Sequence, residues 1–194
     1  MHSLKKFTPD RSWFLFLDRD GVINKKITDR SVLIPDDFKF LEGVKESIKW
    51  FSDSFARIFI VTNQQAVGDE KMTKKDLEDV HEKMLGEIRS SGGNIDKIYF
   101  CSAPGNTWSY CKKPSPGMAV KAKKDFPEID FRKSIMVGDT LNDMKFGKSM
   151  KMVTVFIGNE KKTISTNYRI IDYAFPRLKD FRDFLEKKAI GLES

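Results

Sequence analysis

Two aspartates, Asp18 and Asp20, stand one residue apart directly after an apolar run, FLFL at 14–17. An unbroken apolar run of this kind predicts a strand that is buried on both faces, and in open α/β sheets ligands gather just beyond the carboxyl ends of such strands. Side chains alternate along an extended segment, so the two carboxylates are expected on one side and Arg19 on the other. Two carboxylates in one pocket require a cation or a shared proton, and Mg²⁺ is a suitable hard cation.

Gly21 completes the sequence DRDG and has no Cβ, so the backbone can turn sharply beside the two carboxylates. Asp and Gly are also common residues of ordinary surface turns that follow strands. A catalytic site and a plain turn therefore both fit this segment taken alone, and the rest of the chain decides between them.

Three further polar clusters occur at the ends of later predicted strands or in the loops that follow them. Thr62 and Asn63 offer a hydroxyl group and backbone N–H groups, which suit phosphate oxygens. Lys113 supplies a cation in a loop stiffened by two prolines, and Asp139 supplies a third carboxylate, with Asp143 one helical turn beyond it. Each has an ordinary alternative, as a helix cap, a surface lysine or a loop residue. Their order and common position at strand ends favour a functional site.

The elements that position these clusters alternate between strands and helices. Apolar runs predict strands at 14–17, 57–61, 97–101, 134–137, 152–157 and 170–175. Helical spacing predicts helices at 42–53, 72–90 and 118–126, one that ends at 150, and one at 176–188, with Thr73 as the N-cap of the second. This alternation predicts an α/β fold, a three-layer Rossmann-like parallel sheet with helices on both faces.

The predicted elements also indicate the domain organisation. They fill the intervals 21–62 and 64–113, so no large cap domain is expected. We expect a single domain at 12–190 after an N-terminal tail at 1–11. Neither a signal-peptide core nor a membrane span is found in the sequence, so we expect a soluble, cytoplasmic protein that makes no membrane contact. We also expect a monomer.

The 194 residues carry a formal net charge of +7, which favours acidic ligands such as phosphorylated metabolites. The lysines are scattered, as at Lys123, Lys161 and Lys187, and do not form a stripe with aromatic residues, so nucleic-acid binding is not expected. Of the two histidines, His2 lies in the tail and His81 lies within a helical pattern, where we expect it on the helix flank. A histidine-based triad or a phosphohistidine mechanism therefore has no plausible centre.

Four motifs in this order resemble those of the haloacid dehalogenase superfamily of phosphotransferases. More closely, they resemble its cap-less branch, which contains heptose-bisphosphate phosphatases and histidinol phosphatases. The motifs are DRDGVIN, VTNQ, KPSPGM and GD, which begin at residues 18, 61, 113 and 138. The resemblance covers most of the chain, from Phe14 to Ile157.

The resemblance implies a role for each matched residue. Asp18 would attack phosphorus to form an aspartyl-phosphate, and Asp20 would protonate the leaving alcohol and then deprotonate the attacking water. Mg²⁺ would be held by Asp18, the Asp20 carbonyl and Asp139. The site residues implied are catalytic Asp18, Asp20, Thr62 and Lys113; substrate-binding Arg19, Gly21, Thr62, Asn63, Lys112 and Lys113; and metal-binding Asp18, Asp20 and Asp139.

The loop before KPSPGM departs from the pattern of heptose-bisphosphate phosphatases, which usually bind zinc through a Cys-x-His pair and a Cys-x-Cys pair. Here Cys101 and Cys111 keep two of the four places, while Ala103 and Ser109 take the others. Two thiolates do not make a closed tetrahedral site, so we predict no structural zinc. We also expect no disulfide between them in a reducing compartment. Lys112 stands where these relatives commonly have arginine, which puts the orientation of the substrate in question.

The leading hypothesis is a Mg²⁺-dependent phosphomonoester hydrolase of a small phosphorylated metabolite, most simply a sugar phosphate such as D,D-heptose 1,7-bisphosphate. Histidinol phosphate is an alternative substrate. A polynucleotide 3′-phosphatase is another alternative, because that family shares the DxDG, TNQ and KPxxGM motifs and Trp108 could stack on a base. A hypothesis of a different class is a catalytically silent phosphate-binding protein on the same scaffold.

Overall fold

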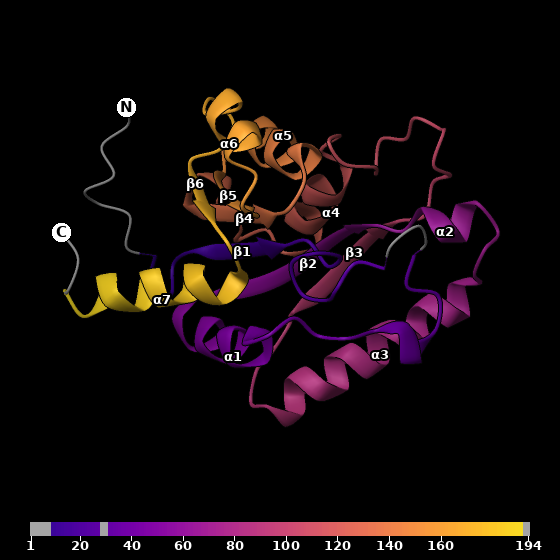
Figure 1. The fold of residues 1–194 in the computed structure, drawn as a ribbon, viewed down its shortest axis with the longest axis horizontal. Helices are drawn as coiled ribbons and strands as arrows, with labels where there is room; N and C mark the ends of the chain where they lie inside the picture. Colours follow the sequence, from indigo (N-terminus) through magenta and orange to yellow (C-terminus); the bar gives the residue numbers. More distant parts are fainter. Residues whose placement is uncertain (1–8, 28–30, 192–194) are drawn as a thin grey trace.

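The computed structural model describes residues 9–27 and 31–191, which form a six-stranded parallel sheet with helices on both faces (Figure 1). The strand order is β3-β2-β1-β4-β5-β6, so β1 lies between β2 and β4. The strands are β1 (Phe14–Leu17), β2 (Arg57–Asn63), β3 (Lys97–Cys101), β4 (Ser134–Gly138), β5 (Val153–Ile157) and β6 (Tyr173–Phe175). The predicted three-layer α/β fold is confirmed.

The helices lie on the two faces of the sheet. They are α1 (Val44–Ser54), α2 (Gln65–Gly68), α3 (Lys74–Ser90), α4 (Gly117–Asp125), α5 (Leu141–Ser149), α6 (Lys161–Thr166) and α7 (Leu178–Ala189), with short 3-10 helices at Pro35–Asp37 and Phe131–Lys133. Alternate residues of β1 point to opposite faces. Leu15 and Leu17 join a core with α1, α3 and α7, whereas Phe14 and Phe16 join a core with α4 and α5. Figure 1 shows these two groups of helices on opposite sides of the sheet.

The helix predicted at 72–90 is α3, and Thr73 is its N-cap. The Thr73 hydroxyl accepts a hydrogen bond from the Asp76 backbone N–H at 3.1 Å, and the Asp76 carboxylate accepts one from the Thr73 backbone N–H at 2.8 Å. This reciprocal capping box satisfies two backbone donors that the helix itself leaves unpaired.

Three local features differ from the sequence predictions. The strand predicted at 170–175 begins only at Tyr173, because the N–H groups of Ile170 and Ile171 both bond to the Asn167 carbonyl in a turn, at 2.9 and 3.1 Å. The helices α2 and α6 have four and six residues, too few for a helical spacing of apolar residues to be visible in sequence.

No cap domain interrupts the described chain between β1 and β3, where loops, a 3-10 helix, β2 and α1 to α3 occur. Most of the predicted N-terminal tail at 1–11, including His2, lies outside the described residues. Within residues 9–27 and 31–191, no helix has the length and apolar character needed to cross a membrane.

Candidate active site

The predicted site residues converge at the carboxyl ends of β1, β2 and β4. Leu17, the last residue of β1, is in register with Ile60 of β2 and Val137 of β4. From β1 the strand order proceeds to β2 and β3 on one side, and then from β4 to β6 on the other. Asp18 therefore lies where the strand order reverses, which is the usual ligand site of open α/β sheets.

Lys113 is a buried cation at the centre of this site. Its Nζ lies 2.9 Å from Asp18 Oδ1 and 2.6 Å from Asp143 Oδ1, and it donates a hydrogen bond to the Val61 carbonyl at 2.7 Å. Burial acts to lower the pKa of Lys113, but the two carboxylates outweigh burial and the pKa is raised. Lys113 is therefore positively charged beside Asp18, and its contact with a phosphate oxygen stays a prediction.

Asp18 is only 8% exposed and is surrounded by other charged groups. Burial raises the pKa of Asp18 to about 7; Lys113 opposes this increase, and Asp143 and Asp20 add to it. Its Oδ1 also accepts a hydrogen bond from the Arg19 backbone N–H at 2.7 Å. A nucleophilic carboxylate must be ionised, so a further cation beside Asp18 would stabilise the reactive form.

Three carboxylates could hold such a cation. Asp18, Asp139 and Asp143 each offer an oxygen, and these oxygens lie within 4.8 Å of one another. Asp139 Oδ1 is buried and has no hydrogen-bond partner among the described residues, whereas Asp139 Oδ2 pairs with Lys26 Nζ at 2.5 Å. A buried carboxylate oxygen without a donor, beside two further carboxylates, fits a hard divalent cation such as Mg²⁺.

Asp143 is more central than the sequence indicated. Its side chain is buried, and its Oδ2 accepts hydrogen bonds from the Thr140 backbone N–H at 3.0 Å and from the Thr140 hydroxyl at 2.5 Å. Thr140 and Asp143 form a capping box that begins α5 and points Asp143 Oδ1 toward Lys113. The Thr-x-x-Asp spacing at 140–143 is the sequence signal for this placement.

Gly21 has a left-handed backbone conformation, with a φ of 90°. A Cβ at this position would collide with the Asp139 carboxylate and would come within 2.9 Å of Lys26 Cε. Glycine thus allows the loop after β1 to pass close to Asp139. A direct contact between Gly21 and the substrate stays a prediction.

Asp20 is held by three donor side chains. It accepts hydrogen bonds from Arg19 Nη2 at 3.0 and 3.1 Å, from Asn24 Nδ2 at 2.9 Å and from Gln64 Nε2 at 2.9 Å. Burial acts to raise the pKa of Asp20, but Arg19, Asn24 and Gln64 outweigh burial and lower it. The carboxylate is therefore ionised and held in one orientation.

The sequence predicts that Arg19 binds the substrate, which stays a prediction; in the structure its side chain contacts other protein groups. Arg19 is completely buried, and its guanidinium group contacts Asp20 at 3.0 Å, Gln64 Oε1 at 3.0 Å and His81 Nε2 at 3.1 Å. The regular alternation of side chains ends with β1 at Leu17, so Arg19 can turn toward Asp20. The buried guanidinium group of Arg19 therefore holds the Asp20 carboxylate in its orientation.

The prediction that His81 lies on a helix flank is wrong. His81 is buried in α3 with 7% exposed. Burial and the charge of Arg19 lower the pKa of His81 to about 3, so the neutral ring accepts a hydrogen bond from the guanidinium group. His81 comes four residues after Leu77 and three before Met84, so the apolar stripe of the helix already contained the signal.

Thr62 and Asn63 end β2 and contact neighbouring groups of the site. Thr62 Oγ1 accepts a hydrogen bond from Gln64 Nε2 at 2.8 Å, which leaves the hydroxyl hydrogen available for a phosphate oxygen. The Asn63 side chain bonds both backbone groups of Lys113: Oδ1 accepts from the N–H at 2.9 Å, and Nδ2 donates to the carbonyl at 3.2 Å. Asn63 therefore fixes the backbone of Lys113 beside β2, a role that the sequence did not indicate.

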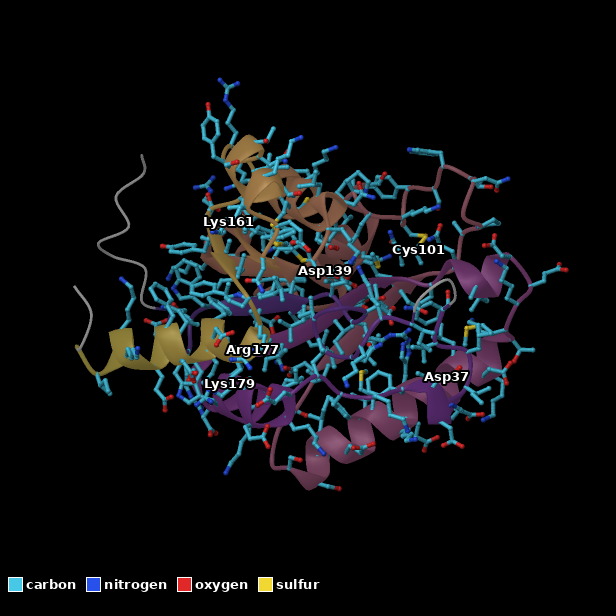
Figure 2. All side chains as sticks on the ribbon, viewed as in Figure 1. Asp37, Cys101, Asp139, Lys161, Arg177 and Lys179 are labelled. Atoms are coloured by element: carbon cyan, nitrogen blue, oxygen red, sulfur yellow. A yellow bond between two sulfur atoms is a disulfide. The ribbon has the colours of Figure 1, made fainter. Side chains whose placement is uncertain are left out.

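The loop between β3 and α4 contains a disulfide, so the prediction that the two cysteines stay unpaired is wrong. Cys101 and Cys111 are bonded, with their Cα atoms 5.4 Å apart, and Figure 2 shows sulfur atoms at the Cys101 label. The loop leaves β3 at Cys101 and returns to its end ten residues later, which brings the two side chains together. Ser109 Oγ lies 3.3 Å from Cys111 Sγ.

Lys112 and Trp108 belong to the same loop. Lys112 Nζ donates hydrogen bonds to the carbonyls of Pro104 at 3.0 Å and Gly105 at 2.6 Å, so it holds the loop closed on itself. Trp108 is 79% exposed. A contact between Lys112 and the substrate stays a prediction.

Known proteins are similar to this chain in sequence and in fold. A family model described as polynucleotide kinase 3 phosphatase matches residues 14–182. The D-glycero-alpha-D-manno-heptose-1,7-bisphosphate 7-phosphatase of Campylobacter jejuni is 36% identical over 176 residues, which cover 91% of this chain and 97% of that protein. The D-glycero-beta-D-manno-heptose-1,7-bisphosphate 7-phosphatase of Helicobacter pylori is 30% identical over 175 residues, which cover 89% of this chain and 95% of that protein.

A solved structure agrees with the fold. The crystal structure of D,D-heptose 1,7-bisphosphate phosphatase from B. bronchiseptica, complexed with magnesium and phosphate, matches with a TM-score of 0.82 at 24% identity, over 91% of this chain and 99% of that chain. The family model and the full-length match to the Campylobacter protein extend the likeness from fold to family. The chain therefore belongs to the polynucleotide kinase 3 phosphatase family, among the haloacid dehalogenase-like phosphatases, and is a phosphatase.

Proposed function

We propose that this phosphatase is a Mg²⁺-dependent phosphomonoester hydrolase that forms an aspartyl-phosphate on Asp18. The observation that carries the proposal is the placement of Asp18 beside Lys113 and within the carboxylate cluster at the switch point of the sheet. A nucleophile, a phosphate-binding cation and candidate metal ligands meet at this point.

The reaction has two steps. In the first, an Asp18 carboxylate oxygen bonds to phosphorus and the bond between phosphorus and the leaving oxygen breaks. Asp20 is ionised in the free site, takes up a proton when the negatively charged phosphate binds beside it, and gives that proton to the leaving oxygen. In the second, water attacks the phosphorus of the aspartyl-phosphate, and Asp20 accepts a proton from that water. The bond between phosphorus and the Asp18 oxygen breaks, which frees the Asp18 carboxylate and releases inorganic phosphate. Arg19, Asn24 and Gln64 hold Asp20 in place during both steps.

Asp18, the Asp20 carbonyl and Asp139 are the ligands proposed for Mg²⁺, and Asp143 completes the cluster around them. The buried Asp139 Oδ1, to which no group of residues 9–27 and 31–191 donates, supports this assignment. When bound, the ion supplies positive charge that offsets the charges of the nucleophile and the phosphoryl oxygens.

The phosphoryl oxygens would be bound by the Thr62 hydroxyl, the backbone N–H of Asn63 and the Lys113 ammonium group. Lys113 carries its charge next to Asp18, and the Thr62 hydroxyl hydrogen is not used by Gln64. These donors stabilise the phosphoryl group most as its charge redistributes in the transition state.

The test is the release of phosphate from p-nitrophenyl phosphate with Mg²⁺. We expect Asp18→Asn to lower kcat by about a thousandfold or more, because the nucleophile is lost. We also expect EDTA to stop turnover and added Mg²⁺ to restore it. Asp53→Asn, an exposed change at the end of α1, is the matched control. A fully active Asp18→Asn variant, or turnover in EDTA, would refute the mechanism, and an inactive wild-type protein would favour a silent phosphate-binding protein.

We propose D,D-heptose 1,7-bisphosphate as the substrate, as the names of the Campylobacter and Helicobacter relatives suggest. These two relatives are named for different anomers, so the anomer must be tested directly. The assay compares both anomers, other sugar phosphates and histidinol phosphate. The proposal requires the highest kcat/KM for one of the heptose bisphosphates.

A polynucleotide 3′-phosphatase is the second candidate, supported by the exposed Trp108 and by the description of the family model. It predicts release of phosphate from a 3′-phosphorylated oligonucleotide, with affinity that falls steeply as salt rises. Trp108→Ala should then weaken oligonucleotide binding by about 1–3 kcal/mol.

Three further properties belong to the proposal. We propose that the protein contains no structural zinc, since both cysteines are held in the disulfide, and metal analysis of the purified protein tests this. We propose a monomer, which light scattering tests. We also propose a cytoplasmic location without contact to nucleic acid or membrane, which cell fractionation tests. Because disulfides are rare in the cytosol, thiol labelling should be done on the same fractions to show whether the two cysteines are bonded there.

A further inference from the structure

Lys26 lies outside the four motifs, yet its ammonium group reaches the carboxylate cluster. Lys26 Nζ is 2.5 Å from Asp139 Oδ2, while half of the side chain, 51%, is exposed. The preceding turn directs it there: Gly21 N–H bonds to the Asn24 carbonyl at 2.8 Å, and Lys25 N–H bonds to the Lys39 carbonyl at 2.9 Å. The lysine stem then passes over Gly21, where a Cβ would come within 2.9 Å of Lys26 Cε.

Lys26 acts as a partial counter-ion of the cluster. The three carboxylates Asp18, Asp139 and Asp143 carry two more formal negative charges than Lys113 can offset. Lys26 offsets one of these two charges. A divalent cation at the same cluster would share Asp139 with the ammonium group. The divalent cation and the Lys26 ammonium group would repel each other because both would contact Asp139, so each weakens the binding of the other.

We propose that Lys26 is a movable cation that holds Asp139 until the divalent cation binds, and then binds an anionic group of the substrate. This inference rests on the proposed function. An ammonium group on a flexible four-carbon stem suits such a change, and the exposed half of the side chain can move without disturbing the core. In a sugar bisphosphate, the anionic group is the phosphate that is not cleaved. Lys26 is thereby a specificity residue for substrates with two anionic groups.

The first test measures Mg²⁺ binding to the full chain by calorimetry, without substrate. We expect Lys26→Met to bind Mg²⁺ about tenfold more tightly than the wild type, because the competing charge is gone. Lys25→Met is the matched control, since Lys25 is an exposed neighbour, and it should change the affinity less than about twofold. Unchanged or weaker Mg²⁺ binding in Lys26→Met would overturn the proposal.

The second test uses steady-state kinetics at saturating Mg²⁺. We expect Lys26→Met to raise KM for a sugar 1,7-bisphosphate about tenfold, with little change in KM for p-nitrophenyl phosphate. Lys26→Arg should restore most of the affinity. Equal effects on both substrates would overturn the specificity role. If the wild type hydrolyses no phosphoester, the proposed function fails, and the Mg²⁺ titration still judges the competition between Lys26 and the metal.

Discussion

Two regions of the molecule differ in how they hold their side chains. The catalytic floor, which we define as Asp18, Asp20, Lys113, Asp139 and Asp143, is at least partly buried, and each member has a partner within hydrogen-bond distance. The substrate loop, residues 102–112, exposes Trp108 and Tyr110 and is held mainly by a disulfide and by Lys112.

Together with the proposed function, this difference predicts that the floor determines the reaction and the loop determines the specificity. Within the floor, ion pairs join Lys113 to Asp18 and Asp143, so a change at one of these residues alters the charge and position of the other two. Groups of the loop face solvent and have few partners, so a change there alters what is bound with little effect on the floor. The following predictions test this separation, from the largest expected effect to the smallest.

Removing the central cation should damage the floor most. Lys113→Met leaves Asp18 and Asp143 buried without their partner, and we expect a loss of about 3–5 kcal/mol in the free energy of unfolding. Activity should fall by about a thousandfold or more. Urea unfolding and phosphate release measure the two effects. Lys112→Met is the control from the loop; it removes two hydrogen bonds to backbone carbonyls and should cost about 1–2 kcal/mol. Equal losses in the two variants would end the distinction between floor and loop.

Arg19→Lys tests whether Arg19 acts through Asp20. Lysine cannot reproduce the planar contacts of the guanidinium group with Asp20, Gln64 and His81, so we expect kcat to fall by about a hundredfold with KM nearly constant. Kinetics with p-nitrophenyl phosphate provide the measurement. A change in KM alone would instead support the original prediction that Arg19 contacts the substrate.

Breaking the disulfide tests the loop. Replacing both Cys101 and Cys111 by serine should lower the free energy of unfolding by about 2–3 kcal/mol, as for closure of a short loop. Because the floor does not include this bond, kcat for p-nitrophenyl phosphate should stay within about twofold of the wild type. Urea unfolding with and without reductant gives the same comparison in the wild-type protein. A collapse of kcat would show that the disulfide supports the floor.

His81 should make the stability depend on pH. Its pKa of about 3 in the folded protein lies below the ordinary value of 6.5, so the unfolded state takes up more protons as the pH falls. The contribution of His81 is complete above pH 6.5 and is lost below it, at up to about 1.4 kcal/mol per pH unit. Asp18, whose pKa is raised, has the opposite slope, but it is present in both proteins when the wild type is compared with His81→Gln. Urea unfolding measures the free energy of unfolding at about pH 5 and about pH 7, and the difference between these two values should be smaller in His81→Gln than in the wild type. An equal difference in the two proteins would contradict this account.

Much of the fold and of the floor could be predicted from the sequence, because both depend on local patterns. The apolar runs at 14–17 and 134–137 predict strands of one parallel sheet, and the residues that follow parallel strands meet at one edge of the sheet. That these two strands are neighbours is shown by the structure. The contact of His81 with Arg19 joins residues 62 positions apart, and it depends on how α3 packs beneath the loop after β1. The path of the substrate loop, and hence the pairing of Cys101 with Cys111, likewise depends on contacts that no local pattern records.

The two hydrogen bonds between the Asn63 side chain and the backbone of Lys113 allow the substrate loop to be replaced without moving Lys113. Both the backbone N–H and the backbone carbonyl of Lys113 are hydrogen-bonded to Asn63 of β2, so the segment before Lys113 can change in length or composition while the lysine keeps its place. A loop taken from another family member could therefore be grafted in place of residues 102–112 to exchange substrates while the catalytic floor stays unaltered.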